Sequence, residues 1–341
     1  MNIEIYALIV YNVDCVTIRL GDNKVLSKYI DGYTLRGMII AGANELYKNR
    51  QILDDINVFP FPDGDTGTNM SSTILAAVNE LEKTNSMKIN TVAKVASGSC
   101  LRGARGNSGV ILSQLFRGFA NGLENLEQAT AAELAKALVN ASETAYRAVI
   151  EPKEGTILTI AHVIGEKATE YAQDVDEIES IFYKLIKRAD EVLRQTKYML
   201  TELRQADVID AGGMGLLHIL NGAYEYLTGH SIDFSHDLNA LETTSTPAPV
   251  VLFNNETNYR YCVEFVFLKE TTPETHKAVD ELRKILPEIG GSIVLASDAC
   301  IVKIHVHTNF PDVVLERANS IGQLSDIKIE NMQIQQFANK D

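Results

Sequence analysis

The sequence lacks a long apolar run and uses cysteine sparingly. No uninterrupted apolar segment reaches the roughly 18 residues that a membrane helix needs, so no integral membrane segment is expected. The apolar stretch Ile5–Val10 follows no basic segment and is not a convincing signal peptide. Four scattered cysteines, at positions 15, 100, 262 and 300, then predict a reducing cytoplasm and no disulfides.

Positive charge is also in short supply. The chain has 31 Lys and Arg against 45 Asp and Glu, which gives a formal net charge of −14. An acidic surface repels a phosphate backbone, so no nucleic-acid partner is expected. A small nucleotide is still compatible with this charge, because backbone N–H groups and metal ions can hold its phosphates.

The length of 341 residues favours two domains, and the periodicity of apolar residues changes along the chain. Between residues 32 and 229, apolar residues recur at steps of three and four, which predicts seven or more helices and hardly a strand. The segments that carry this spacing are 35–46, 74–81, 110–123, 134–150, 157–171, 181–193 and 214–227.

A second unit with strand periodicity follows a stretch rich in Thr, Pro and Asn. Segments 259–267 and 301–307 alternate with period two and predict strands. Helices are predicted at 276–286, with Pro287 after its end, and at 311–321, and a last strand at 327–332. The expected organisation is an N-terminal extension at 1–27, a helical domain at 28–228, a linker at 229–257 and a small α+β domain at 258–341.

The run Asn57–Met70 concentrates two carboxylates, Asp63 and Asp65, among prolines and glycines without a basic residue. Taken alone, Pro-Asp-Gly is ordinary turn chemistry, and Asp commonly caps a helix. However, two carboxylates one residue apart can converge on a hard cation, and glycines let the backbone approach a ligand. A helix follows at once, so the run has what a magnesium–phosphate site at a helix N-terminus needs.

Three further segments open predicted helices with glycine. Gly103–Gly109 can present free N–H groups to an anion, although it matches neither a Walker loop nor a dinucleotide fingerprint. Taken by itself, Asp210–Gly215 fits a capped, closely packed helix as well as it fits a ligand site. Glu154–Leu158 adds the hydroxyl of Thr156. Several such starts in one helical domain favour helix N-termini that converge on a polyanion.

The second domain carries a candidate metal cluster. His305 and His307 alternate in one predicted strand and share a face, and Cys262 lies in another strand. One Cys and two His suit zinc, but on spacing alone such a set is more often unremarkable. Glu264 shares the face of Cys262 and is a further possible ligand, although its spacing favours an exposed side chain.

Together, the acidic run, the three glycine-rich helix starts and their order resemble the large, ATP-binding subunit of bacterial fatty acid kinase, over about residues 28–341. The N-terminal domain of that family is similar to the ATP-binding domain of dihydroxyacetone kinase. The resemblance implies an eight-helix antiparallel barrel that binds ATP and two Mg²⁺ at one end. It implies that Asp63 and Asp65 hold the metals, with Asn57 and Asp55 as nearby oxygen donors, and that Cys262, His305 and His307 bind Zn²⁺.

The resemblance also implies that the nucleotide contacts come from the acidic run and the glycine-rich helix starts. They are Thr66, Gly67, Thr68, Asn69, Gly106, Asn107, Ser108, Gly109, Thr156, Asp210, Gly212 and Gly213.

The resemblance implies ATP-dependent phosphoryl transfer to the carboxylate of a fatty acid that a separate fatty-acid-binding carrier protein presents. A carboxylate is ionised at neutral pH, so no strong base is required. Two alternatives stay open: a kinase of a dihydroxyacetone-like triose, and a nucleotide-binding regulatory module without catalysis. In the family, a third domain implicated in carrier docking follows, and this chain is expected to end before it. A homodimer is implied by the resemblance alone.

Overall fold

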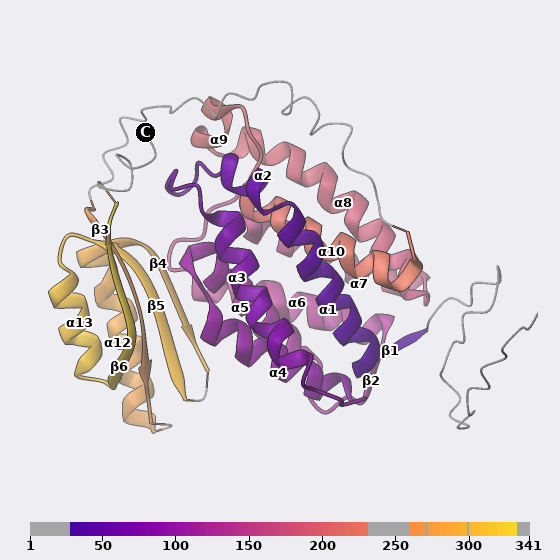
Figure 1. The fold of residues 1–341 in the computed structure, drawn as a ribbon, viewed down its shortest axis with the longest axis horizontal. Helices are drawn as coiled ribbons and strands as arrows, with labels where there is room; N and C mark the ends of the chain where they lie inside the picture. The colour runs from indigo at the N-terminus through magenta and orange to yellow at the C-terminus, as the bar shows by residue number, and fades with distance from the viewer. Residues whose placement is uncertain (1–27, 231–258, 271, 299, 333–341) are drawn as a thin grey trace, which may run out of the picture.

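The computed structural model describes residues 28–230, 259–270, 272–298 and 300–332 (Figure 1). The predicted N-terminal extension and most of the predicted linker lie outside these residues. The described chain forms a mostly helical domain followed by a small α+β domain, which confirms the predicted fold class.

Eight long helices build the first domain. They are α1 (Gly32–Lys48), α3 (Thr66–Leu81), α4 (Ile89–Gly103), α5 (Gly106–Gly122), α6 (Ala131–Ala148), α7 (Ile157–Asp174), α8 (Ile178–Met199) and α10 (Ala211–Thr228). Short helices α2 (Arg50–Asp55) and α9 (Thr201–Ala206) lie in the connections. A two-stranded antiparallel ribbon joins β1 (Tyr29–Asp31) to β2 (Gln128–Thr130).

The long helices close into a ring. Each one packs against the next in chain order, and α10 packs against α1 to complete the barrel. Small residues allow this close approach. A Cβ on Gly118 would lie 2.1 Å from the Asn140 carbonyl oxygen, and one on Gly222 would lie 2.4 Å from that of Ala41. The helix faces that meet in the ring are apolar and form one continuous core.

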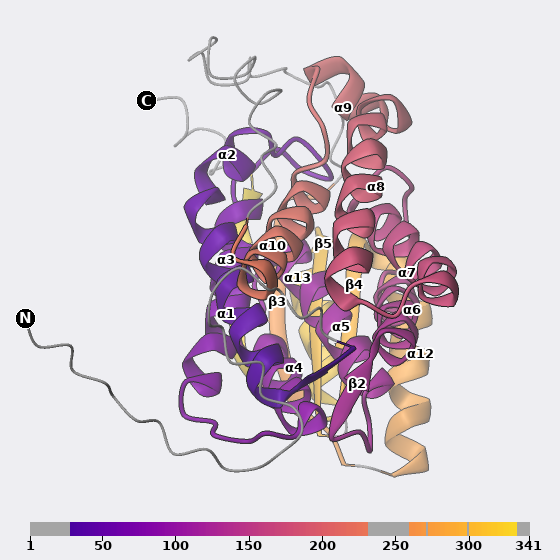
Figure 2. The same cartoon turned by 90° about the vertical axis from the view of Figure 1, so that its right-hand side faces the viewer.

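Local capping explains where several helices begin. The Asp31 side chain accepts a hydrogen bond from the Thr34 N–H and starts α1. Thr130 and Glu133 form a reciprocal capping box at the start of α6. Figure 2 shows the ring with the sheet of the second domain behind it.

The α+β domain is a four-stranded antiparallel sheet with the order β4-β5-β3-β6. Its elements are β3 (Tyr261–Leu268), α12 (Pro273–Ile289), β4 (Gly290–Ser297), β5 (Ile301–Thr308), α13 (Pro311–Asn319) and β6 (Gln323–Asn331). Helices α12 and α13 cover one face of the sheet over a core that includes Phe265, Phe267 and Leu286. The other face turns toward the helical domain (Figure 1).

Apolar and backbone contacts join the two domains. Leu101, Ala104, Val110 and Ala148 of the helical domain form one buried cluster with two β4 residues, Val294 and Ala296. The Ile150 N–H donates to the carbonyl of Ile293, and Arg283 donates to the carbonyl of Arg147. The side chains of β5 that face the helical domain are therefore held against it.

Several elements differ from the sequence expectations. Helix α4 and strand β4 were not predicted, and α3 begins at Thr66, eight residues before the predicted segment. Pro287 lies inside the last turns of α12 rather than after its end. Strand β4 was hidden because residues on both of its faces are buried, so it shows no alternation of apolar and polar residues.

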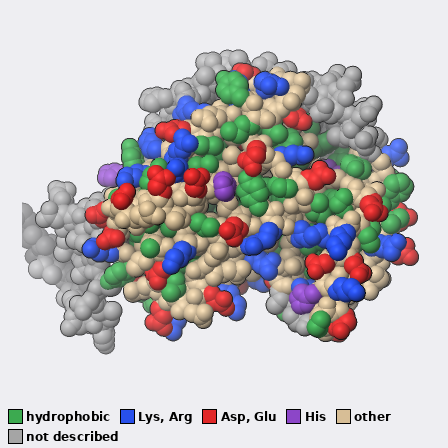
Figure 3. Space-filling model, turned by 180° about the vertical axis from the view of Figure 1, so that it is seen from behind, with side chains coloured by type: hydrophobic (Ala, Val, Ile, Leu, Met, Phe, Trp, Pro, Cys, Tyr) green, Lys and Arg blue, Asp and Glu red, His purple; other side chains and the backbone are tan. Residues whose placement is uncertain are grey.

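Acidic and basic side chains are interspersed on the face seen in Figure 3. None of the helices within the described ranges is both long and apolar enough to cross a membrane.

Candidate functional site

A cavity of about 370 Å³ lies between the helical barrel and the sheet. Its helical side is lined by the first residues of four helices, α3, α5, α7 and α10, which include Thr66, Gly106, Ile157 and Gly212. These helices occupy alternate places in the ring. Because neighbouring helices in the ring run antiparallel, the four N-termini open at the same end. Side chains cap some of the N–H groups in these first turns, and the helix dipoles together with the N–H groups that remain uncapped favour an anion there.

Asp63 and Asp65 face this cavity from the turn before α3. Burial and the charge of Asp65 raise the pKa of Asp63 well above its ordinary value, and the two carboxyl groups share a hydrogen bond. Burial also raises the pKa of Asp65. Two convergent carboxyl groups whose ionisation is opposed by burial and by their mutual repulsion are a donor set that fits a hard divalent cation, since such a cation offsets that repulsion.

Asn57 shapes the acidic turn. Its Oδ1 accepts hydrogen bonds from the Asp65 N–H at 3.3 Å, the Thr66 N–H at 3.0 Å and the Thr66 hydroxyl at 2.7 Å. Its Nδ2 donates to the carbonyl of Phe61 at 3.0 Å. The oxygen that was expected to bind Mg²⁺ is therefore engaged in fixing the start of α3.

Other carboxylates near the turn differ in their placement. Asp55, the other oxygen donor considered, accepts from the Gln51 side chain and does not line the cavity. Asp54 accepts from the Thr68 N–H at 3.0 Å and from its hydroxyl at 2.7 Å. The charge of Asp54 adds to the burial that raises the Asp65 pKa, so helix α2 places a third carboxylate beside the acidic turn that sequence reasoning missed.

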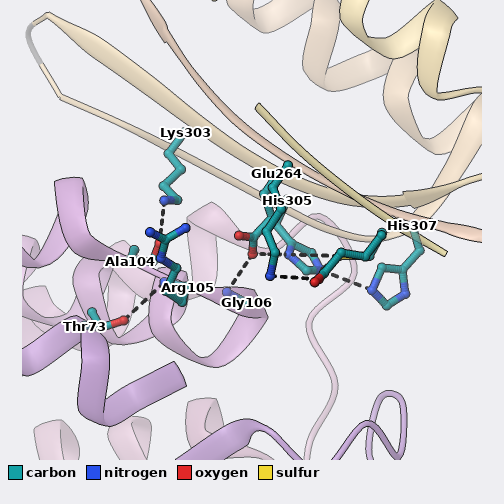
Figure 4. Close-up of polar contacts among 11 residues, drawn as sticks. Thr73, Ala104, Arg105, Gly106, Glu264, Lys303, His305 and His307 are labelled. Atoms are coloured by element: carbon teal, nitrogen blue, oxygen red, sulfur yellow. Dashed lines mark hydrogen bonds and ion pairs between the residues drawn. The ribbon is translucent and has the colours of Figure 1, made fainter. Parts of the chain in front are cut away.

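The two residues that join α4 to α5, Ala104 and Arg105, and the first residue of α5, Gly106, each have a backbone group held by a side chain (Figure 4). Lys303 Nζ donates to the Ala104 carbonyl, the Arg105 N–H donates to Thr73 Oγ1, and the Gly106 N–H donates to Glu264 Oε1 at 2.6 Å. Gly106 has a φ of 57°, a left-handed conformation that glycine adopts without strain. Within the described residues, the buried Oδ1 of the following Asn107 has no hydrogen-bond partner.

Cys262, His305 and His307 come together at the sheet side of the cavity, with one ligand atom of each within 4.8 Å of the others. Cys262 Sγ lies 3.9 Å from His305 Nε2, and His305 Nε2 lies 3.2 Å from His307 Nε2. Burial, reinforced by the charge of His305, lowers the pKa of His307 to about 3. A neutral imidazole, a second imidazole and a thiol converging in this way fit the donor set of a zinc site.

Glu264 is buried, contrary to the expectation of an exposed side chain, with 5% of its surface accessible. Its Oε1 lies 2.8 Å from His305 Nδ1. Burial alone would raise the pKa of Glu264, but the hydrogen bond and the charge of His305 outweigh burial and lower it to about 2. Burial likewise opposes the charged form of His305, but Cys262 and Glu264 outweigh it and raise the His305 pKa to about 10.

Comparison with known families agrees with this division of the chain. Residues 60–225 match the model of the DAK2 domain, and residues 258–338 match that of the FakA-like middle domain, which is named for fatty acid kinase. The chain belongs to the DAK2-domain proteins with a FakA-like middle domain. The cavity thus lies between a DAK2 domain and a middle domain.

Similar proteins include uncharacterized proteins of staphylococci. One from Staphylococcus haemolyticus is 38% identical over 313 residues, and one from Staphylococcus epidermidis is 37% identical over 311 residues. Each alignment covers 90% of this chain but 56% of the relative. A solved dihydroxyacetone kinase from C. freundii, in complex with AMP-PNP and Mg²⁺, has a TM-score of 0.44 and 14% identity, covering 63% of this chain and 38% of that one.

Asp210 ties two helix N-termini of the DAK2 domain together. Its Oδ2 accepts from the Gly213 N–H at 2.6 Å, and the carboxylate also accepts from the Ile157 N–H. Burial raises the pKa of Asp210 to about 7, although these two hydrogen bonds act against the shift. Asp210 therefore holds the starts of α7 and α10 in a fixed relation at the edge of the cavity.

Most predicted nucleotide-site residues of the DAK2 domain line the cavity, but Gly67, Thr68, Gly109 and Gly213 do not. A Cβ on Gly67 would lie 2.0 Å from the Arg50 carbonyl oxygen, and one on Gly109 would lie 2.3 Å from Thr73 Oγ1. These two glycines permit close packing beside the cavity. The Gly213 N–H is used by Asp210, as described above.

Two residues that hold the α4–α5 connection, Thr73 and Lys303, were not singled out from the sequence. For Lys303 a signal was present, because it shares the strand parity of His305 and His307 and so lies on the same face of β5. Thr73 carries no such signal. It lies 32 positions before Arg105 in the sequence, and only the fold brings its hydroxyl to the Arg105 N–H.

Proposed function

We propose that this protein binds MgATP in the cavity between its DAK2 and middle domains and transfers the γ-phosphoryl group to the carboxylate of a fatty acid. The observation that carries the proposal is the meeting of four helix N-termini and two convergent carboxyl groups at one cavity. The N-termini favour phosphate oxygens, and the carboxyl groups favour the cations that accompany phosphates.

On this proposal, Asp63 and Asp65 hold the magnesium ions, whose positive charge favours the ionised carboxylates that burial opposes. When bound, Mg²⁺ neutralises the charge of the phosphate oxygens. The N–H groups of Asn107 and Ser108 at the start of α5 bind the phosphates, while Asn57 and Asp210 keep the surrounding helix starts in place. The chain thus contributes positioning and charge, which are the main requirements of phosphoryl transfer.

A fatty-acid acceptor is supported by the match of residues 258–338 to the FakA-like middle domain, whose model is named for fatty acid kinase. The acceptor carboxylate is already ionised at neutral pH, so the site needs no general base to activate it. The product would be an acyl phosphate, and the fatty acid would arrive on a separate carrier protein. We also propose that Cys262, His305 and His307 bind zinc.

An assay of ATP consumption decides among the acceptors. The protein is incubated with Mg²⁺, ATP and either a fatty acid loaded on a fatty-acid-binding protein or dihydroxyacetone. Turnover with the loaded carrier, abolished by Asp65→Asn, is the expected result. Turnover with dihydroxyacetone alone would show that the acceptor is a triose and not a fatty acid. Nucleotide binding without turnover of either acceptor would favour a regulatory module.

A further inference from the structure

We infer that Glu264 is a positioning residue that couples the Cys/His cluster to the phosphate-binding loop, so that metal bound at the cluster strengthens the binding of MgATP. This inference rests on the proposed function, since it takes residues 104–108 as the phosphate-binding loop. It assigns the middle domain a direct part in nucleotide affinity.

The coupling runs through one oxygen atom. Glu264 Oε1 accepts a hydrogen bond from the Gly106 N–H at 2.6 Å and also lies 2.8 Å from His305 Nδ1 (Figure 4). Glu264 and His305 are register partners on adjacent antiparallel strands, β3 and β5. Both side chains are buried, with 5% and 3% of their surfaces accessible, so the oxygen has little freedom to leave either partner.

The loop is held from the sheet at two points. Glu264 binds the N–H of Gly106, and Lys303 binds the carbonyl of Ala104, two residues earlier. Both groups come from strands of the middle domain, while the loop belongs to the DAK2 domain. With Gly106 fixed as the first residue of α5, the next two N–H groups, those of Asn107 and Ser108, remain for the cavity, which both residues line.

The two ring nitrogens of His305 have different nearest partners. Nδ1 lies 2.8 Å from Glu264 Oε1, to which it donates when Glu264 is ionised, and Nε2 lies 3.2 Å from His307 Nε2. Cys262 Sγ lies 3.9 Å from both nitrogens. Metal-binding histidines commonly donate their other N–H to a carboxylate, which fixes the ring and makes it a better ligand. A metal at the cluster therefore fixes the ring that orients Glu264, and Glu264 fixes the Gly106 N–H.

A carboxylate at a helix N-terminus can also act as a stand-in for phosphate. In that case Glu264 would compete with ATP, and fixing it more firmly would weaken nucleotide binding. The positioning role is favoured because Glu264 takes only the first N–H of α5, and because Lys303 holds the same loop from the same sheet without carrying negative charge. The two roles predict opposite effects of the metal.

The test measures binding of Mg²⁺ with a nonhydrolysable ATP analogue by calorimetry, using the full chain loaded with Zn²⁺ or stripped by a chelator. In the wild type, stripping is expected to weaken analogue binding about tenfold, within the usual range of coupling between sites. In Glu264→Ala this dependence on zinc is expected to fall below about twofold. Glu264→Gln, whose amide oxygen is a weaker acceptor for the same donors, should be intermediate.

Zinc affinity, measured by competition with a chromogenic chelator, gives the matched readout. Glu264→Ala is expected to weaken zinc binding about tenfold. Lys303→Met, which removes the hydrogen bond from the sheet to the Ala104 carbonyl, should leave zinc affinity unchanged and retain the dependence of analogue binding on zinc. If Glu264→Ala fails to give a wild-type circular dichroism spectrum, Glu264→Gln decides.

The inference is overturned if stripping zinc leaves wild-type analogue affinity unchanged or increases it, or if both Glu264 variants keep the full dependence on zinc. Failure of the zinc-loaded wild type to bind the analogue at all would instead contradict the proposed function. The two failures are therefore distinguishable in one series of titrations.

Discussion

The ring of Phe61 meets the imidazole of His307 edge-on, with centroids 6.3 Å apart and planes inclined by 80°. Phe61 belongs to the acidic turn of the DAK2 domain, and His307 to the Cys/His cluster of the middle domain. The acidic turn and the Cys/His cluster therefore pack against each other, in addition to lining the same cavity. The positive charge of His305 also acts on Asp63, where it partly offsets the burial that raises the Asp63 pKa.

Truncation of Phe61 should be costly, because its side chain is 3% exposed and joins the two domains. We expect Phe61→Ala to lower the free energy of unfolding by about 3 kcal/mol. Phe61→Leu keeps most of the volume and loses mainly the edge contact with the imidazole, for about 1 kcal/mol. Urea unfolding of the metal-free chain measures both, and equal midpoints for Phe61→Ala and the wild type would show that this contact does not hold the domains.

The closeness of the barrel helices can be tested with a matched pair of glycines. A Cβ on Gly118 in α5 would lie 2.1 Å from the Asn140 carbonyl oxygen of α6, so Gly118→Ala should destabilise the protein by about 3 kcal/mol. Gly98 in α4 has only the flexible Arg102 guanidinium near that position, at 3.3 Å. Gly98→Ala should therefore stabilise the helix by up to about 1 kcal/mol. Thermal unfolding in which both variants behave alike would contradict the ring packing.

The carboxyl of Asp210 makes stability depend on pH. Burial raises its pKa from 3.8 in the unfolded chain to about 7 in the folded one, so the folded state holds the proton more tightly. The free energy of unfolding is therefore highest below pH 3.8 as far as Asp210 is concerned. It falls as the pH rises from 3.8 to about 7, and above about pH 7 it changes no further. Asp210→Asn removes this titration.

The readout for Asp210 is the difference in melting temperature between Asp210→Asn and the wild type. The variant loses one acceptor for the two N–H groups of α7 and α10, which lowers its stability at every pH. The difference should nevertheless shift in favour of the variant by roughly 5 °C between pH 5 and pH 8. If the melting temperatures of the variant and the wild type change in parallel between pH 5 and pH 8, Asp210 is already ionised at pH 5 and the prediction is wrong.

Much of the fold was accessible from periodicity because the barrel helices each bury one face in a single core. Helix α4 escaped notice since its last turns contain Ser97, Gly98 and Ser99, which dilute the apolar spacing. Strand β4 escaped because Ile293, Val294, Leu295 and Ala296 are all buried, two against the helices of its own domain and two against the DAK2 domain. A strand covered on both faces has no alternation to detect.

The site was predictable where chemistry is local in the sequence. The pairing of Asp63 with Asp65 and the shared strand face of His305 and His307 follow from spacing alone. The role of Glu264 did not follow, because parity gives the face of a strand but not what that face packs against. Likewise, nothing in the sequence around Asn57 shows that its side-chain oxygen accepts three hydrogen bonds within the turn.

The central claim is that Asp63 and Asp65 make the interdomain cavity a site for MgATP. Calorimetric titration of the wild type, Asp63→Asn and Asp65→Asn with ATP, in the presence and absence of Mg²⁺, tests it most directly. We expect Mg²⁺-dependent binding by the wild type and a loss of about a hundredfold in affinity for each variant, since each removes one carboxylate from the metal. Binding of MgATP by both variants with wild-type affinity would contradict the account.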